Sequence, residues 1–233
     1  MKTPFWRRWF SSVRTAKQRR PVSRARRQRQ PLRLELLEDR TTPSLTPQMV
    51  LDINANTLSS NPSALVAIGS TTCFTATDGV QGFELWRSDG TAAGTVLVKD
   101  INPGSASSNP SSLTNVNGTL FFTASDGSTG VELWKSDGTA AGTTLVKDIY
   151  PGTTIWYSPG NLTVVNGTLF FTAGDGTHGY ELWKSDGTAA GTTLVKDINP
   201  GSGGSSPSVL TNVNGTLFFS ADDGTHGVEL WRS

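Results

Sequence analysis

Residues 159–206 read PGNLTVVNGTLFFTAGDGTHGYELWKSDGTAAGTTLVKDINPGSGGSS, and the 233-residue chain repeats this phrase, with variations, in three other places. Intervals of 48, 49 and 48 residues separate Trp86, Trp134, Trp183 and Trp231, and equally Pro62, Pro110, Pro159 and Pro207. A fixed period of this length is typical of folds that are built from stacked supersecondary units. We therefore divide the repeat region into units 62–109, 110–158, 159–206 and 207–233.

Each unit is predicted to contain four short β-strands. In the third unit, residues 162–165 lead into Asn166-Gly167, a dipeptide that favours a two-residue type I′ hairpin because both positions need positive φ. The strands that follow, separated by Asp-Gly turns, are expected at 168–173, 180–184 and 193–198. Four antiparallel strands in one unit match a blade of a β-propeller, whose repeats are about 40–50 residues long.

The second strand of each unit is apolar on both faces. It contains Leu-Phe-Phe in three units, at 120–122, 169–171 and 217–219. Such a strand must be covered on both sides, as it is when blades stack radially. The repeated tryptophans are expected to pack between the blades, because aromatic side chains bury large areas. The glutamates two residues before them are expected to pair with lysines of the fourth strand; they are Glu84, Glu132, Glu181 and Glu229, and the lysines are Lys99, Lys147 and Lys196.

The ends of the repeat region predict how the propeller closes. The last unit stops at Ser233, after its third strand, and residues 48–54 match a fourth strand because Asp52 lies 48 residues before Asp100. We therefore predict an all-β fold, a β-propeller of four four-stranded blades whose last blade is closed by the N-terminal strand. The alternative is that this chain supplies half of a larger ring. The protein is thus expected as a monomer or a two-chain ring.

Charge divides the chain into two parts. Residues 1–40 hold 13 of the 20 lysines and arginines and 3 of the 19 acidic residues, a local charge of +10, whereas the remaining 193 residues carry −9. We interpret residues 1–45 as a basic, largely disordered leader or export segment, and 46–233 as the propeller. The acidic repeats lack the phosphate-neutralising side chains of a nucleic-acid site. No apolar run is long enough for a transmembrane helix or for the core of an ordinary signal peptide.

Two phrases resemble known bacterial families. Residues 33–44, RLELLEDRTTPS, resemble the LEPR-XLL-type leader of planctomycete surface or exported proteins, although Asp39 stands where that leader has proline. Residues 132–143, ELWKSDGTAAGT, and their copies at 84–95 and 181–192 are similar to the bacterial ELWxxDGT repeat family. These resemblances imply a propeller-like protein of undetermined activity, located extracellularly or on the cell surface. A disordered tail or a nucleic-acid arm is the alternative for the leader.

The repeated acidic residues are interpreted as turn residues. Two aspartate sets precede glycines, where an Asx hydrogen bond and positive φ favour tight turns: Asp78, Asp126, Asp175 and Asp223, and Asp89, Asp137 and Asp186. Calcium binding is the alternative, but the loops lack the alternating aspartates of an EF-hand. His178 and His226 share their turn position with Gln81 and Thr129, which suits an exposed turn better than a metal ligand or general base. No catalytic residue, cofactor site or metal site is predicted.

One linker differs from the others. The segments that follow the fourth strands of the first and third units are small and polar, NPGSASSN at 102–109 and NPGSGGSS at 199–206. The second reads YPGTTIWYS at 150–158, is one residue longer, and carries three aromatic side chains, Tyr150, Trp156 and Tyr157. Loops on a rigid frame often carry binding specificity, so we predict a ligand-contact patch at these three residues. Packing of Trp156 under its own loop is the alternative.

These features predict a non-catalytic, exported or cell-surface β-propeller that acts as an interaction scaffold for a protein or polysaccharide ligand. Nearly all acidic residues of the repeats recur in every unit, which argues against one unique catalytic pair of carboxylates. The alternatives are a hydrolase or lyase that acts on polysaccharide, and a purely structural module of a cell envelope. Nucleic acid is not an expected partner.

Overall fold

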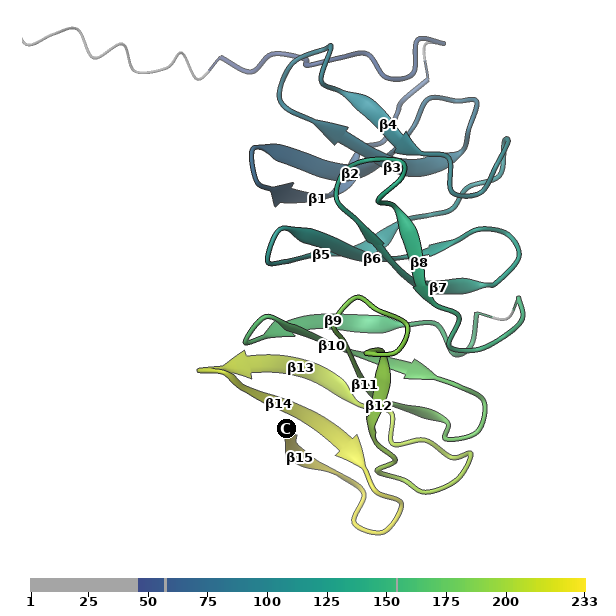
Figure 1. Ribbon diagram of the computed structural model, residues 1–233, viewed down its shortest axis with the longest axis vertical. Coiled ribbons are helices and arrows are strands. Elements are labelled where there is room, and N and C mark those ends of the chain that lie inside the picture. The colour runs from purple at the N-terminus through teal and green to yellow at the C-terminus, as the bar shows by residue number, and fades with distance from the viewer. Residues whose placement is uncertain (1–45, 57, 154) are drawn as a thin grey trace, which may run out of the picture. The chain divides into compact units, whose positions relative to one another are not determined.

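The computed structural model describes residues 46–56, 58–153 and 155–233 (Figure 1). Residues 47–233 form one compact unit. The predicted leader, residues 1–45, lies outside the described residues. All helices and strands found in the described ranges are β-strands, which confirms the all-β fold class. None of these ranges contains a helix that could cross a membrane.

The strands form four antiparallel sheets, one for each repeat unit (Figure 1). The first sheet contains β1 (Ser63–Ile68), β2 (Thr71–Thr77), β3 (Phe83–Ser88) and β4 (Val96–Lys99). The second contains β5 (Ser111–Val116), β6 (Thr119–Ser125), β7 (Val131–Ser136) and β8 (Thr144–Lys147). The third contains β9 (Gly160–Val165), β10 (Thr168–Gly174), β11 (Tyr180–Ser185) and β12 (Thr193–Lys196). The fourth contains three strands, β13 (Ser208–Val213), β14 (Thr216–Asp222) and β15 (Val228–Arg232).

The hairpins that open the later sheets turn at Asn-Gly. Asn117 and Gly118 have φ angles of 53° and 90°, and Asn166 and Gly167 have φ angles of 49° and 77°. Both positions are left-handed, as a type I′ turn requires, and the predicted hairpin is confirmed. The asparagine side chains also reach the next sheet, since Asn166 Nδ2 donates a hydrogen bond to Gly215 O at 2.9 Å. The turns therefore help to connect neighbouring sheets.

The sheets stack in sequence order, with β1 against β5, β5 against β9, and β9 against β13. On β6, Phe122 is fully buried in a cluster with Leu85 of the first sheet, whereas Phe121 is buried in a cluster with Phe171 of the third. The apolar second strand is therefore covered on both faces, as predicted. We call the interface between two successive sheets a joint.

A lysine and a tryptophan recur at each joint. Lys99 Nζ lies 5.9 Å from the ring centroid of Trp134 and donates a hydrogen bond to Thr143 O at 2.8 Å. The same lysine-over-ring contact occurs at 5.5 and 5.3 Å in the pairs Lys147–Trp183 and Lys196–Trp231. The predicted burial of tryptophan between sheets is confirmed for Trp134 and Trp183, which are 6% and 5% exposed. At each joint, a lysine ammonium group of one sheet thus makes a cation–π contact with a tryptophan ring of the next sheet.

The predicted pairing of the repeated glutamates with these lysines is wrong. In the β3–β4 pair, a register shift places Lys99 opposite Leu85. Glu84 instead accepts hydrogen bonds from the backbone N–H groups of Ile101 at 3.0 Å and Ser108 at 2.8 Å. The carboxylate therefore fastens the following linker to its own sheet.

The predicted closure of the last blade by an N-terminal strand is not observed. Residues 48–54 form no strand, and the fourth sheet consists of β13, β14 and β15 alone among the described residues. Ile53 packs against Phe74 and Trp86 of the first sheet. Three four-stranded sheets and one three-stranded sheet therefore form an open stack of propeller-like blades in residues 47–233 (Figure 1).

Candidate functional site

Residues 150–158, which we call the aromatic linker, connect β8 of the second sheet to β9 of the third. The backbone of this linker is anchored as in a sister linker. Tyr157 O accepts a hydrogen bond from Gly174 N at 3.1 Å, as Ser108 O does from Ser125 N at 2.9 Å. Tyr157 therefore occupies the position that serine holds in the ordinary linkers.

Two glycines of the third unit make room for two tyrosine rings. A Cβ atom at Gly174 would lie 2.2 Å from Cδ1 of Tyr157, and one at Gly176 would lie 2.5 Å from Cε2 of Tyr150. The two rings contact each other, with centroids 4.9 Å apart and planes inclined at 32°. Both tyrosines are half-buried. They therefore form a packed platform at the base of the linker.

Ile155 and Trp156 lie on the outside of the linker, 66% and 83% exposed. Their turn is closed by Ser158, whose hydroxyl donates a hydrogen bond to Ile155 O at 2.8 Å. Ser158 O in turn accepts a hydrogen bond from the Tyr180 hydroxyl at 2.8 Å, which ties the turn to β11. An exposed apolar pair on an anchored turn is a candidate contact surface.

The structure separates the three predicted site residues into two roles. Tyr150 and Tyr157 contact each other in the platform, whereas Trp156 is exposed, and this exposure disfavours the alternative of packing under the loop. Sequence reasoning missed Ile155 and the supporting Gly174. A signal was present, because the position of Gly174 is occupied in the sister units by the larger residues Thr77, Ser125 and Asp222.

One buried carboxyl loses a partner because of the aromatic linker. In the neighbouring sheets the repeated glutamate accepts a hydrogen bond from a serine hydroxyl of its linker, in the pairs Glu84–Ser108 and Glu181–Ser205. The second sheet has Glu132, and its linker has Tyr157 in place of that serine. Glu132 is 3% exposed and accepts a hydrogen bond from Ile149 N at 3.1 Å. Burial, opposed in part by backbone hydrogen bonds, raises the pKa of Glu132 to about 7.

We expect Glu132 to make the protein less stable as the pH rises from about 5 to 8. Its pKa rises from the ordinary 4.5 to about 7 on folding, so folding favours the protonated form. The stabilisation is complete below the unfolded pKa and is lost as the pH rises through the folded pKa. The full shift corresponds to a loss of at most about 3 kcal/mol. Urea unfolding across this pH range measures it.

The matched variant is Glu132→Gln, which should flatten the pH profile because its amide does not titrate. Hydrogen bonds to Asp175 and Asp223 raise the pKa values of His178 and His226, but both histidines are common to the two proteins. Tyr157→Ser returns a hydroxyl donor to the linker and should move the fall in stability to lower pH. An unchanged slope in Glu132→Gln would show that another group titrates.

The histidine turns are held by local hydrogen bonds. Asp175 Oδ1 accepts hydrogen bonds from the N–H groups of Thr177 and His178, each at 2.9 Å, and its Oδ2 lies 2.7 Å from His178 Nδ1. Asp223 and His226 repeat the ring contact at 2.8 Å. These are the Asx turns expected from the sequence. Within the part of the chain that the structure describes, no group of three His, Cys, Asp or Glu side chains is placed to share a metal ion.

No protein-family model matches the chain, and no curated protein matches it. Among solved structures, Bacteroides ovatus Xyloglucan PUL GH43B is similar at 19% identity and a TM-score of 0.39, with 76% of this chain and 39% of that chain covered. Puromycin hydrolase is similar at 15% identity and a TM-score of 0.42, with coverages of 78% and 31%. The α-L-arabinofuranosidase CtGH43 from Clostridium thermocellum is similar at 14% identity and a TM-score of 0.35, with 73% of this chain and 66% of that chain covered. The chain thus spans less than half of the first two, and these likenesses carry no argument about its activity.

Proposed function

We propose that this chain is a non-catalytic binding module of the ELWxxDGT repeat class, located extracellularly or on the cell surface, and that the aromatic linker contacts its ligand. The observation that carries the proposal is the exposure of Ile155 and Trp156 on a turn that hydrogen bonds of Ser158 tie to β11. The sister linkers offer only small side chains at the corresponding place. The sister units form the same scaffold without this apolar pair, so the pair adds an exposed apolar surface that the other linkers lack.

The chemistry of the linker favours a neutral polysaccharide as the ligand. Residues 150–158 carry no charged side chain, so an ionic ligand would find no counter-charge within the linker itself. The indole of Trp156 is flat, rigid and 83% exposed, and it can cover the apolar face of a sugar ring with little loss of side-chain entropy. An apolar side chain of a partner protein is the other ligand that this surface can accept.

We expect Trp156→Ser to weaken binding to a neutral polysaccharide at least tenfold, because the exposed indole supplies most of the apolar contact. Its folding should be nearly unchanged, since the side chain is 83% exposed. Affinity electrophoresis against a panel of soluble neutral polysaccharides measures the binding, and the thermal midpoint measures the folding. Val209→Ser is the matched control, because Val209 is 76% exposed on β13. Equal binding by the wild type and Trp156→Ser would contradict the proposed site.

A polysaccharide-cleaving enzyme is the second candidate, and Glu132 is the observation that favours it. A buried carboxyl with a raised pKa beside an unusual loop has the property of a general acid. Incubation of the same polysaccharides with the protein, followed by an assay for new reducing ends, separates the two functions. Cleavage that Glu132→Gln abolishes supports the enzyme, whereas binding without cleavage supports the module.

A further inference from the structure

The last sheet exposes the apolar face that, in the other three sheets, packs against the next sheet. In the first three sheets, the leucine before the repeated tryptophan faces the next sheet and is 0–1% exposed; these residues are Leu85, Leu133 and Leu182. The corresponding Leu230 of β15 is 75% exposed, and Val228 beside it is 70% exposed. Within residues 46–233 as described, one edge of β15 pairs with no strand, whereas β4, β8 and β12 pair with the corresponding strands of the other sheets. Exposed apolar edges of this kind favour pairing with another strand.

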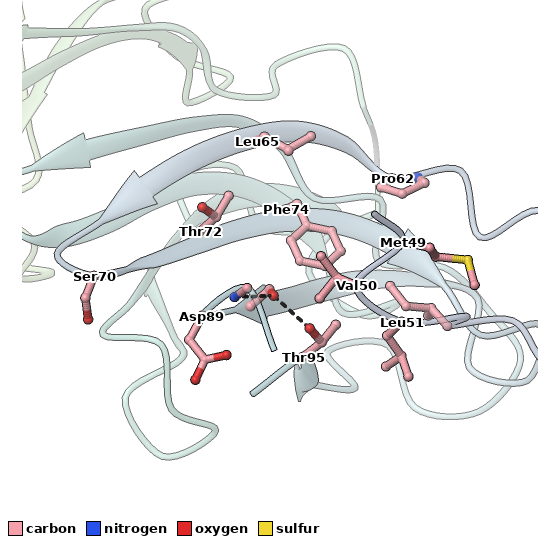
Figure 2. Close-up of a pocket in the computed structure, with 13 residues that line it drawn as sticks. Met49, Val50, Leu51, Pro62, Leu65, Ser70, Thr72, Phe74, Asp89 and Thr95 are labelled. Atoms are coloured by element: carbon pink, nitrogen blue, oxygen red, sulfur yellow. Dashed lines mark hydrogen bonds between the residues drawn. The ribbon is translucent and has the colours of Figure 1, made fainter. Parts of the chain in front are cut away.

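The first sheet presents the opposite half of a joint. A groove of about 530 Å³ is lined by Val50, Leu65 and Phe74, which Figure 2 shows, together with Thr72 and Ser88. Leu65 is 65% exposed, whereas its counterpart Leu113 of the second sheet is packed into the joint below the first sheet. The surface that receives a preceding sheet in the second, third and fourth units is thus open in the first.

The segment 49–54 already occupies part of this joint. Ile53 packs on Trp86 of the first sheet, as Ile101 packs in the cluster of Trp134 one unit later. The side-chain amide of Asn54 lies 3.0 Å from a Cβ atom placed on Gly79. The equivalent contact one repeat later, 48 residues on, joins the Asn102 amide to a Cβ atom placed on Gly127 at 2.7 Å. The segment therefore lies where the end of a preceding fourth strand would lie, and the described residues contain no other strand of such a sheet.

We propose that a second copy of this chain docks head to tail at these two surfaces. The segment 49–54 of one copy remains on its own first sheet and pairs as the fourth strand with β15 of the other copy. The three-stranded sheet of that copy then fills the groove at Leu65 and Phe74. The argument is continuity with an established interface, because the joint already forms three times within each chain and the two ends carry its two halves. Such head-to-tail contacts close into rings or extend as chains.

The repeat also fixes the register of the new strand pair. In the first sheet Leu85 lies opposite Lys99 and Trp86 lies opposite Leu97. Shifted by the repeat, the same register places Leu51 of one copy opposite Leu230 of the other, and Met49 opposite Trp231. These facing side chains are apolar, and Met49, Leu51 and Leu230 are 79%, 37% and 75% exposed in the single chain. Their burial supplies the driving force for docking.

Light scattering on the full chain between about 1 and 100 µM tests the association. We expect the mass of the wild type to rise above the 24.8 kDa of one chain towards twice that value or more. Leu230→Asp should keep the protein at single-chain mass throughout, with an unchanged circular dichroism spectrum because the side chain is exposed. Val209→Asp is the control, since Val209 is equally exposed on β13. A wild type that stays at single-chain mass, or an unaffected Leu230→Asp, overturns the proposal.

Cross-linking tests the register and shows whether the contact joins two chains. One protein carries Leu51→Cys and another carries Leu230→Cys, both with Cys73→Ala, which removes the buried native thiol. After mild oxidation, the mixture should give a disulfide-linked pair, whereas Leu230→Cys mixed with Val80→Cys should not, because Val80 lies in a turn outside the segment. A disulfide that forms only when both cysteines are in one chain shows closure within the chain, and the proposal is then wrong. Neither test depends on the ligand of the aromatic linker.

Discussion

Gly179→Ala lowers the free energy of unfolding by about 3–4 kcal/mol, in our expectation, because a methyl group has no space there. A Cβ atom at Gly179 would lie 2.4 Å from Gly204 N and 2.5 Å from Gly204 Cα. Both contacts are to backbone, so no side chain can rotate away. The φ of Gly179 is +67°, which adds the left-handed penalty of about 1–2 kcal/mol for a residue with a Cβ. Urea unfolding gives the change in free energy.

The chain contains a matched control for this substitution. Gly227 holds the same turn position in the last unit, with φ of +73°, and a Cβ atom built there meets nothing within 4 Å. Gly227→Ala should therefore lose only the left-handed penalty of about 1–2 kcal/mol. The difference between the two variants measures the close approach of Gly204. Equal losses would show that the linker can move aside at no cost.

Glu181→Ala should destabilise the protein by about 3–4 kcal/mol, because it leaves buried donors without an acceptor. Glu181 is fully buried, and its carboxylate accepts hydrogen bonds from Ser205 N at 2.7 Å and Ile198 N at 3.3 Å. The Ser205 hydroxyl donates to the same group. Each buried donor that loses its partner costs about 1–3 kcal/mol, and water cannot reach this site easily. The measurement is again the free energy of urea unfolding.

The last sheet supplies the control here as well. Glu229 has the same place in the repeat but is exposed, and the described chain has no fourth strand or linker after it. Glu229→Ala should change the free energy of unfolding by no more than about 0.5 kcal/mol. If the two variants are equally destabilised, the glutamate acts within its own strand and the bonds to the linker contribute little.

The repeat and the local chemistry of its turns predicted most of the fold. The residue types of Asn166-Gly167 predict its left-handed backbone conformation, which the structure has. The strands of the third unit begin and end within two residues of the predicted positions. The pairing of Lys99 was mispredicted because a register shift in the β3–β4 pair moves this lysine to a position opposite Leu85. Such a register shift arises from the packing of the two strands against each other, and neither strand's sequence predicts it.

The closure of the last blade was harder to predict, because one repeat segment can belong to either of two neighbouring sheets. Residues 48–54 match a fourth strand equally well before the first sheet and after the last, so the sequence cannot choose between the two places. In the single chain, Ile53 packs on Trp86 of the first sheet, and residues 48–54 form no strand with either sheet. For the aromatic linker, the sequence showed that residues 150–158 differ from the sister linkers, but it did not show how their side chains pack. The two packed rings are accommodated by Gly174 and Gly176, which lie 17 residues after Tyr157 and 26 residues after Tyr150.

The stacking of each sheet on its sequence neighbours makes this protein a one-dimensional array. An inner sheet is held by two joints and an end sheet by one, so local opening is easiest at the ends and hardest in the middle. Duplication or deletion of one whole unit preserves every joint that remains. The length of such a protein can therefore change in evolution by whole units, with little need for compensating substitutions elsewhere.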